Sequence, residues 1–397
     1  MPRHSTPLLA ALLVMYSVYQ MISTLIAPLV GELGITTFQI GLVFTVTSVT
    51  ITVTSLLWGV LFDFTGPRPI LFAGLLLCVA GPAGFAAAVA FGLDETLTPD
   101  LAFAFVLVFR SVVLGAGIAA LLVLALASVG RETSGETART RGVGFVGAAQ
   151  GLGIVLGPVV GGALAAGSLL VPLYVSPVIA LVAALVVLVV VKPSAELPRL
   201  DPPVRTSPVL LLPAFGTGFF AYLALGLAQT VVVHLASDRL RMPSGALSGV
   251  LLAGGLGLVL TQGLLVPLLK WSPSRLMKIG GPLSLAGYAL LAVAPSAALM
   301  SLAFLVAAIG AGLALTGFAA TASLGTGSRH QGVVAGLVTT TSGLTFLAAP
   351  MLTTLLYDVD PVAPVVAAGA AALVATGLAF VPAAPVTQVA GPYPGAN

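Results

Sequence analysis

Apolar runs of about 20 residues recur along this chain from one end to the other, separated by short polar segments. Each run is long enough to cross the roughly 30 Å hydrocarbon core of a bilayer as a helix. Charged residues make up only 7% of the 397 residues, whereas soluble proteins carry about 25%. Backbone groups in lipid must bond within their own segment, which favours helices. The chain is therefore predicted to be an all-α polytopic membrane protein with no room for a soluble catalytic domain.

Twelve helical spans fit this pattern, six on either side of one polar, proline-rich segment. That segment, KPSAELPRLDPPVRT at 192–206, is predicted to be a cytoplasmic linker. It separates an N-terminal six-helix half (1–191) from a C-terminal six-helix half (207–383), which a short polar tail (384–397) follows. The predicted spans are 8–29, 38–61, 69–92, 101–128, 142–165, 169–191, 209–234, 245–269, 277–296, 299–323, 332–356 and 362–382.

The basic residues are distributed unequally between the two sets of loops. If both termini are cytoplasmic, the inner loops carry twelve basic residues and the outer loops carry only Arg239 and Arg241. This positive-inside bias predicts a multi-pass protein of the cytoplasmic membrane with both termini in the cytoplasm. The twelve are Arg3, Arg68, Arg131, Arg139, Arg141, Lys192, Arg199, Arg205, Lys270, Arg275, Lys278 and Arg329.

The fifth and eleventh spans resemble each other. Gly151-Leu152 and Gly157-Pro158 recur 192 residues later as Gly343-Leu344 and Ala349-Pro350. Two related halves around a central cavity are one known way to build a transporter. Chance similarity between two helices rich in Gly and Ala is the alternative explanation.

The fifth span also holds the densest run of residues that destabilise water-exposed helices, by about 1 kcal/mol for each Gly and about 3 for Pro. Gly153, Gly157 and Gly161 are four residues apart and so form one stripe along a helix. Small residues let neighbouring membrane helices approach closely, so the stripe predicts a tight packing seam. The full motif is Gly144, Gly153, Gly157, Pro158, Gly161 and Gly162.

A second motif, WGVLFDFTGPRPIL, ends the second span. Gly59 allows close helix approach, and Gly66 permits a tight turn before Arg68. Asp63 places a carboxylate at the membrane edge, where a helix N-terminus or a cation would stabilise it. A topological turn with a solvated ion pair is the simpler interpretation.

Arg110 is the only formally charged residue deep inside a predicted span. A charge at that depth is costly unless it is paired or hydrated, which makes Arg110 a functional candidate. The alternative is an arginine that bonds only to backbone carbonyls of neighbouring helices.

These motifs together resemble those of the major facilitator superfamily, most closely its drug and small-molecule:proton antiporter branch. The glycine run meets every fixed position of the antiporter motif G-x8-G-x3-G-P-x2-G-G. The loop motif departs from the family pattern at Phe64 and Pro67, where basic residues are usual. The glycines that the family has after its arginine occur here as Gly115 and Gly117, one residue later than expected. The resemblance implies twelve helices in two pseudo-symmetric halves that rock about a central site.

The resemblance also implies roles for particular residues. Asp63 would latch the cytoplasmic ends of the halves with Arg68 in the same network, and the glycine stripe would limit leak. Arg110 would serve proton coupling or hold a substrate charge. The first, fourth, seventh and tenth helices would line the cavity, where aromatic rings and a few polar groups suit an amphipathic or lipophilic solute. The cavity candidates are Tyr16, Tyr19, Gln20, Ser23, Phe220, Tyr222, Gln229, Thr316 and Phe318.

The predicted function is efflux of a small molecule by proton antiport. No Asp or Glu lies mid-span, so a facilitator or organic-anion transporter that uses Arg110 without protons is an alternative. A non-transporting membrane sensor is another. The sequence contains no phosphate-binding loop, metal cluster or nucleophile elbow, so neither an enzyme nor a cofactor or metal is expected. The predicted partners are the solute, protons and the bilayer, with no nucleic acid, and the protein is expected to be a monomer.

Overall fold

The computed structural model describes residues 5–191, 208–239, 241–242 and 244–381, and these residues form an all-helical membrane protein. Among them, ten helices are long and apolar enough to cross a bilayer. The 20-residue α11 and the 17-residue α14 complete the twelve predicted segments. The predicted all-α fold of a polytopic membrane protein is thus confirmed. The proposed linker at 192–206 and tail at 384–397 lie outside the described residues.

The first half consists of α1 (Ser5–Glu32), α2 (Thr37–Thr65), α3 (Pro67–Leu93), α4 (Pro99–Val106), the π-helix η1 (Leu107–Val113), α5 (Leu114–Glu132), α6 (Glu136–Ala165) and α7 (Leu170–Val190). The second half consists of α8 (Pro208–His234), the π-helix η2 (Leu235–Arg239), α9 (Ser244–Leu260), the π-helix η3 (Thr261–Leu265), α10 (Val266–Leu269), α11 (Pro273–Ala292), α12 (Ala297–Leu324), the 3₁₀-helix η4 (Ser328–His330), α13 (Gln331–Tyr357) and α14 (Ala363–Ala379).

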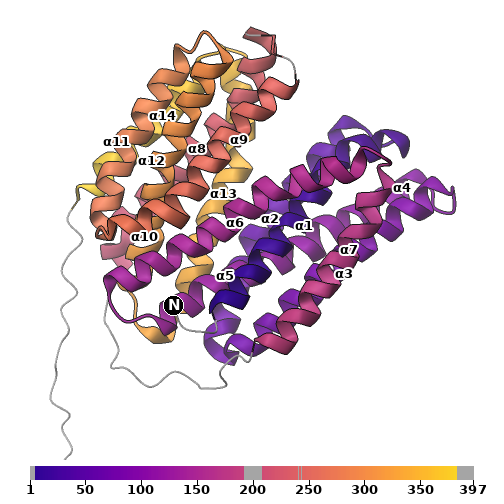
Figure 1. Ribbon diagram of the computed structural model, residues 1–397, viewed down its shortest axis with the longest axis horizontal. Coiled ribbons are helices and arrows are strands. Elements are labelled where there is room, and N and C mark those ends of the chain that lie inside the picture. The colour runs from indigo at the N-terminus through magenta and orange to yellow at the C-terminus, as the bar shows by residue number, and fades with distance from the viewer. Residues whose placement is uncertain (1–4, 192–207, 240, 243, 382–397) are drawn as a thin grey trace, which may run out of the picture.

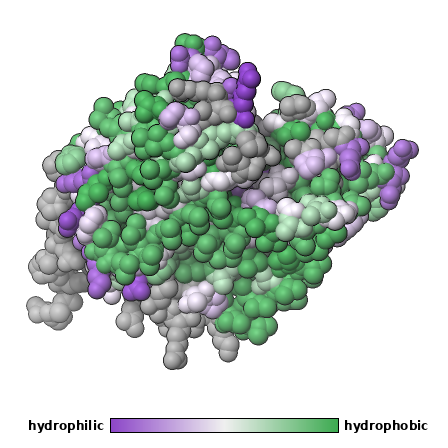
Figure 2. Space-filling model, turned by 45° about the horizontal axis from the view of Figure 1, so that its top comes forward, coloured by the Kyte–Doolittle hydropathy of each residue, from purple (hydrophilic) through white to green (hydrophobic). Residues whose placement is uncertain are grey.

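The two halves form two helical bundles that lie together at one end and diverge toward the other (Figure 1). We call the first end the α10 end and the second the α4 end. Side chains on the outside form a broad hydrophobic surface, with hydrophilic residues gathered at its margins (Figure 2). This distribution suits a protein surrounded by lipid, because a charged side chain that faces the hydrocarbon core costs free energy and an apolar one does not.

Local sequence explains where helices begin. Thr36 and Gln39 form a reciprocal capping box at the start of α2. Gly66 adopts φ +82°, a left-handed conformation, and Pro67 follows at the first position of α3. The tight turn predicted at Gly66 is therefore present, and it sets α2 and α3 side by side at the α10 end.

The repeat found in the sequence has equivalent contacts in the two halves. A Cβ added at Gly157 of α6 would lie 2.5 Å from the carbonyl oxygen of Ser17 on α1. Its counterpart Ala349 of α13 packs against Gly226 of α8, where an added Cβ would lie 2.7 Å from the Ala349 Cβ. Because α1 and α8 are the first helices of their halves, the halves share one internal arrangement, as the predicted pseudo-symmetry requires.

Candidate functional site

Arg110 lies on the π-helix η1 and is fully buried, with 0% of its surface exposed. Its guanidinium donates to the hydroxyl of Ser23 on α1 at 2.7 Å and to the hydroxyl of Thr47 on α2. The ring centres of Tyr19 and Phe44 lie 5.0 and 5.1 Å from its central carbon. The predicted residues Arg110, Tyr19 and Ser23 are thus brought together.

The charge of Arg110 has no acidic partner among the described residues. The Arg110 Nε is buried without a hydrogen-bond partner. Hydroxyls and aromatic faces solvate a guanidinium only in part. π-Helical turns often occur at functional sites. The positive charge of Arg110 is therefore only partly compensated by its surroundings.

A small polar cavity lies between the halves. It measures about 40 Å³, roughly the room for a few water molecules. Gln150 of α6 donates at 3.0 Å to the hydroxyl of Tyr16, whose ring packs edge-on against Tyr19 near Arg110. Gln262 of η3 faces the cavity and makes no hydrogen bond to the described residues. The polar residues that line the cavity are Gln150, Tyr222, Gln262, Thr316, Thr339 and Ser342.

Several predicted cavity residues lie elsewhere. Phe318 is fully buried in the contact between α8 and α12, where its ring packs edge-on against Phe215 at 5.2 Å. A Cβ on Gly157 would lie 2.6 Å from the Gln20 Cβ, so Gln20 takes part in helix packing. Phe220 packs against Phe219, and Gln229 is half-buried on α8 without lining the cavity. Phe318 therefore lies on the face of α12 that meets α8 and does not line the polar cavity, a distinction that helical spacing alone did not reveal.

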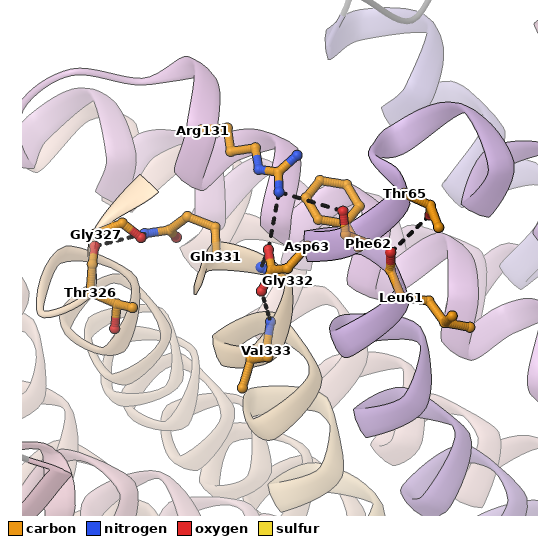
Figure 3. A network of polar contacts seen from close by, with 10 residues as sticks. All are labelled: Leu61, Phe62, Asp63, Thr65, Arg131, Thr326, Gly327, Gln331, Gly332 and Val333. Carbon is orange, nitrogen blue, oxygen red and sulfur yellow. Dashed lines mark hydrogen bonds and ion pairs between the residues drawn. The ribbon is translucent and has the colours of Figure 1, made fainter. Parts of the chain in front are cut away.

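Asp63 joins the two halves at the α10 end (Figure 3). Its carboxylate accepts from the backbone N–H groups of Gly332 at 2.8 Å and Val333 at 2.9 Å. These groups belong to the first turn of α13, whose positive end attracts an anion. Arg131 of α5 donates to the same carboxylate at 3.1 Å and lies over the Phe62 ring. The sequence indicated a helix N-terminus or a cation for Asp63, and the structure has both.

Arg131 was not identified as the partner of Asp63 from the sequence, where Arg68 was expected in that network. Arg68 is exposed at the same end. The sequence did contain one signal for Arg131. It is a basic residue in the last turn of a helix, and such a residue lies at the same membrane edge as the loops.

A second polar contact between the halves involves Arg139 of α6, which the sequence analysis had placed only among the inner-loop charges. It donates to the carbonyl oxygen of Ser323 on α12 at 3.0 Å. It also donates to the carbonyls of Gly130 and Thr133 at the end of α5. Gln331 bonds to the hydroxyl and carbonyl of the same Ser323. Ser323 thus joins α12 to both α6 and α13.

The glycine motif of α6 faces two different partners. An added Cβ on Gly153, Gly157 or Gly161 would lie 2.5 to 2.9 Å from atoms of α1, within the first half. A Cβ on Gly144 would lie 2.7 Å from the carbonyl oxygen of Gln262, in the other half. Gly162 has open space beside it. Pro158 lies inside α6. The motif therefore packs α6 closely on α1 and, at the α10 end, on η3.

The α2–α13 contact also depends on small residues. A Cβ on Gly59 would clash with the carbonyl oxygen of Gly332, and one on Gly336 would lie 2.6 Å from the carbonyl oxygen of Ser55. Nearer the middle of α2, Thr340 donates to the carbonyl of Thr52 at 2.9 Å. These contacts extend from the α10 end to about the middle of both helices.

Residues 8–350 match the model of the Major Facilitator Superfamily. The chain belongs to this superfamily. Its members are membrane transporters, and the two helical halves are those of a transporter fold. No curated protein matches the chain.

Solved structures of similar fold agree with this assignment. The human organic anion transporter MFSD10 (TETRAN) superposes with a TM-score of 0.77 at 18% identity, over 96% of this chain and 100% of that one. A bacterial homologue of the iron transporter ferroportin, in an outward-facing state, gives 0.76 at 14%, over 95% and 98%. FucP in the outward conformation gives 0.70 at 15%, over 94% and 97%.

Proposed function

We propose that this protein is a secondary active transporter that exports a small amphipathic solute across the cytoplasmic membrane by alternating access. In this proposal residues 1–191 rock against 207–383, and an acidic group of the solute pairs with Arg110. The observation that carries it is the buried Arg110, which has no carboxylate partner among the described residues. A buried unpaired charge is expensive to maintain, so its retention favours a functional anion partner.

The positive-inside pattern orients the α10 end toward the cytoplasm. The state described here then has its cytoplasmic side closed by Asp63 and Arg139, with the halves apart on the outer side (Figure 1). FucP in its outward conformation and the ferroportin homologue in its outward-facing state have a similar fold, which is consistent with this orientation. Small polar and aromatic groups at the midplane suit a solute with both apolar and hydrogen-bonding parts.

Proton exchange is favoured by the antiporter-type glycine motif, whose central glycines pack α6 tightly on α1. A facilitator without proton coupling is the second candidate, favoured by the absence of mid-span acids from the sequence. One protein of similar fold is an organic anion transporter. An anionic solute that pairs with Arg110 fits both the antiporter and the facilitator.

The test uses purified protein in liposomes with a pH-sensitive dye inside and an imposed proton gradient. Amphipathic anions, neutral drugs and lipophilic cations are added in turn. Arg110→Gln should reduce anion flux by about a hundredfold or more, because loss of a buried charge partner costs 2–5 kcal/mol. Arg141→Gln, at an exposed position, is the matched control and should keep wild-type flux.

Each outcome decides a different part of the proposal. Anion flux with a dye response supports antiport, and anion flux without one supports the facilitator. If Arg110→Gln transports anions as fast as the Arg141→Gln control, the anion role of Arg110 is wrong. Absence of flux for every compound class would favour a non-transporting protein.

A further inference from the structure

His234 ends α8 at the α4 end of the molecule and is a titratable group that the proposed function does not yet use. Its Nδ1 lies 3.0 Å from the carbonyl oxygen of Thr230. A carbonyl oxygen only accepts, so Nδ1 carries the proton of the neutral ring and Nε2 keeps its lone pair. Nε2 makes no hydrogen bond to the residues that the structure describes. His234 can therefore take up a proton at Nε2.

An aromatic ring and a carboxylate complete a cluster around His234. The ring of Tyr357, the last residue of α13, lies 5.1 Å from the imidazole, centre to centre. The Tyr357 hydroxyl donates at 3.0 Å to Oδ2 of Asp238 on η2. Ser237 donates to the other carboxylate oxygen at 3.2 Å. The cluster thus connects α8 and η2 to α13, and its carboxylate is exposed.

The charged groups at this end of the second half leave it negative while His234 is neutral. They are three acids and two bases: Asp238, Asp358, Asp360, Arg239 and Arg241. Their net charge is −1, and a proton on His234 brings it to zero. Of the other helices packed against α8, the sequences of α9, α12 and α14 contain no charged residue. The two basic residues of α11 lie at its start, at the α10 end.

The α4 end of the first half is also acidic. Its connecting segments, at 30–37, 93–100 and 166–169, contain no basic residue. They carry four exposed acids, Glu32, Asp94, Glu95 and Asp100. Like charges repel, and salt screens them less once they approach within about 8 Å. The halves diverge at this end (Figure 1), so closing it would bring two negative surfaces together.

Helix α8 borders the space between the halves. Tyr222 of this helix lines the polar cavity and packs against a hydrophobic cluster that includes residues of the first half. When the halves rock together at the α4 end, the outer end of α8 approaches the first half and loses water. An unpaired carboxylate is more costly to desolvate than a carboxylate beside a cation. A protonated His234 would supply that cation next to Asp238.

We propose that His234 is the proton-binding group of the outer side, and that its protonation from the outer medium permits the α4 end to close. This proposal rests on the alternating access proposed above. It gives the antiport version a proton site, although the sequence has no mid-span acid. The proton would bind after the solute leaves and would accompany the return to the state that opens to the cytoplasm.

The test follows the width of the α4 end as the pH changes. Spin labels are attached to Thr96→Cys and Ala298→Cys, exposed positions of the two halves at that end; the native Cys78 is fully buried. Pulsed electron paramagnetic resonance measures the distance between the labels in phosphatidylcholine nanodiscs without solute. The pH is lowered from 8 to 5, the range in which imidazoles gain charge. The ratio of closed to open protein should rise on the order of tenfold, a typical coupling between sites.

Two variants should shift this ratio in opposite directions. His234→Gln keeps the net charge negative, so the α4 end should stay open at every pH. Asp238→Asn removes the negative charge without a proton, so the α4 end should already close at pH 8. His330→Gln, at an exposed position of the α10 end, is the matched control and should respond to pH as the wild-type protein does.

The proposal is overturned if His234→Gln responds to pH as the His330→Gln control does, or if Asp238→Asn stays open at pH 8. A wild-type distance that does not change between pH 8 and pH 5 also contradicts it. Because no solute is present, failure here is distinguishable from failure of the Arg110 test, which follows anion flux.

Discussion

The α2–α13 seam and the α6–α9 seam join the halves at equivalent places in the repeat, yet different chemistry closes them. At the α2–α13 seam a carboxylate bonds to free N–H groups of α13. At the α6–α9 seam, which continues into η3 and α10, Gly144 and Gly147 pack on the backbone and amide of Gln262. Small residues thus pack closely at both seams, and only the α2–α13 seam adds a charged contact.

The difference follows from where α6 and α13 begin. Gly332 and Val333 are in the first turn of α13, so their N–H groups have no intrahelical acceptor. At the same offset of 192 residues, their counterparts Thr140 and Arg141 lie beyond the first turn of α6, which already begins at Glu136. Their N–H groups are used within the helix, and a carboxylate there would have no donor.

The largest effect should come from filling the α2–α13 seam. Gly59→Ala places a Cβ against the Gly332 carbonyl, and overpacking against backbone costs about 1–3 kcal/mol or more. The α10 end should open. Ala335 is 5% exposed and lines a small cavity of about 10 Å³ beside Ser323 and Gln331. A cysteine at this position should then react with a water-soluble maleimide about a hundredfold faster than in the protein that retains Gly59. The native Cys78 is fully buried.

Gly41→Ala on the same helix is the control, because an added Cβ there meets nothing within 4 Å. Equal labelling of the Gly59→Ala and Gly41→Ala proteins would show that the seam tolerates a methyl group and that the packing argument fails.

Removing the charge at Asp63 should have the next largest effect. Asp63→Asn keeps one acceptor oxygen but loses the attraction to the α13 N-terminus and to Arg131. Hydrogen bonds to charged groups contribute about 1.5–3 kcal/mol, so labelling at Ala335→Cys should rise roughly thirtyfold. Asp100→Asn makes the same change at the α4 end and should not alter it. An unchanged rate for Asp63→Asn would mean that packing alone closes the seam.

A smaller effect is expected from Arg139→Gln. The variant loses the donor to the Ser323 carbonyl, while Gln331 continues to bond to Ser323. A net contribution of about 1 kcal/mol corresponds to an increase of roughly fivefold in the same labelling rate. The exposed Arg141→Gln is the charge-matched control. If Arg139→Gln and Arg141→Gln are labelled at the same rate, Arg139 contributes to closure of the α10 end only through its charge.

The smallest effect is expected from an attempt to copy the charged latch onto the α6–α9 seam. Leu269 stands four residues before Pro273, as Asp63 stands four before Pro67. Leu269→Asp should slow labelling by less than about twofold, because α6 has no free N–H groups at that level. If Leu269→Asp slows labelling by as large a factor as Asp63→Asn speeds it, the explanation based on where α6 and α13 begin is wrong.

The sequence by itself determined the helices and the Asp63 motif, but not every helix end: α6 begins at Glu136, whereas the predicted span began at 142. Helix formation in lipid is local, because each segment must satisfy its own backbone, so apolar length and capping residues such as Thr36 and Pro67 suffice. Arg110 also stood out from sequence, because a charge at that depth has few benign explanations.

Only the tertiary structure decided which faces meet. Arg131 and Arg139 bond to Asp63 and Ser323, which lie 68 and 184 residues away in the sequence, and no local pattern specifies those contacts. The π-helices η1 and η3 change the helical register around Arg110 and Gln262, so spacing along the chain no longer predicts direction. The same limit applies to Phe318, because its contact with Phe215 depends on how α8 and α12 pack.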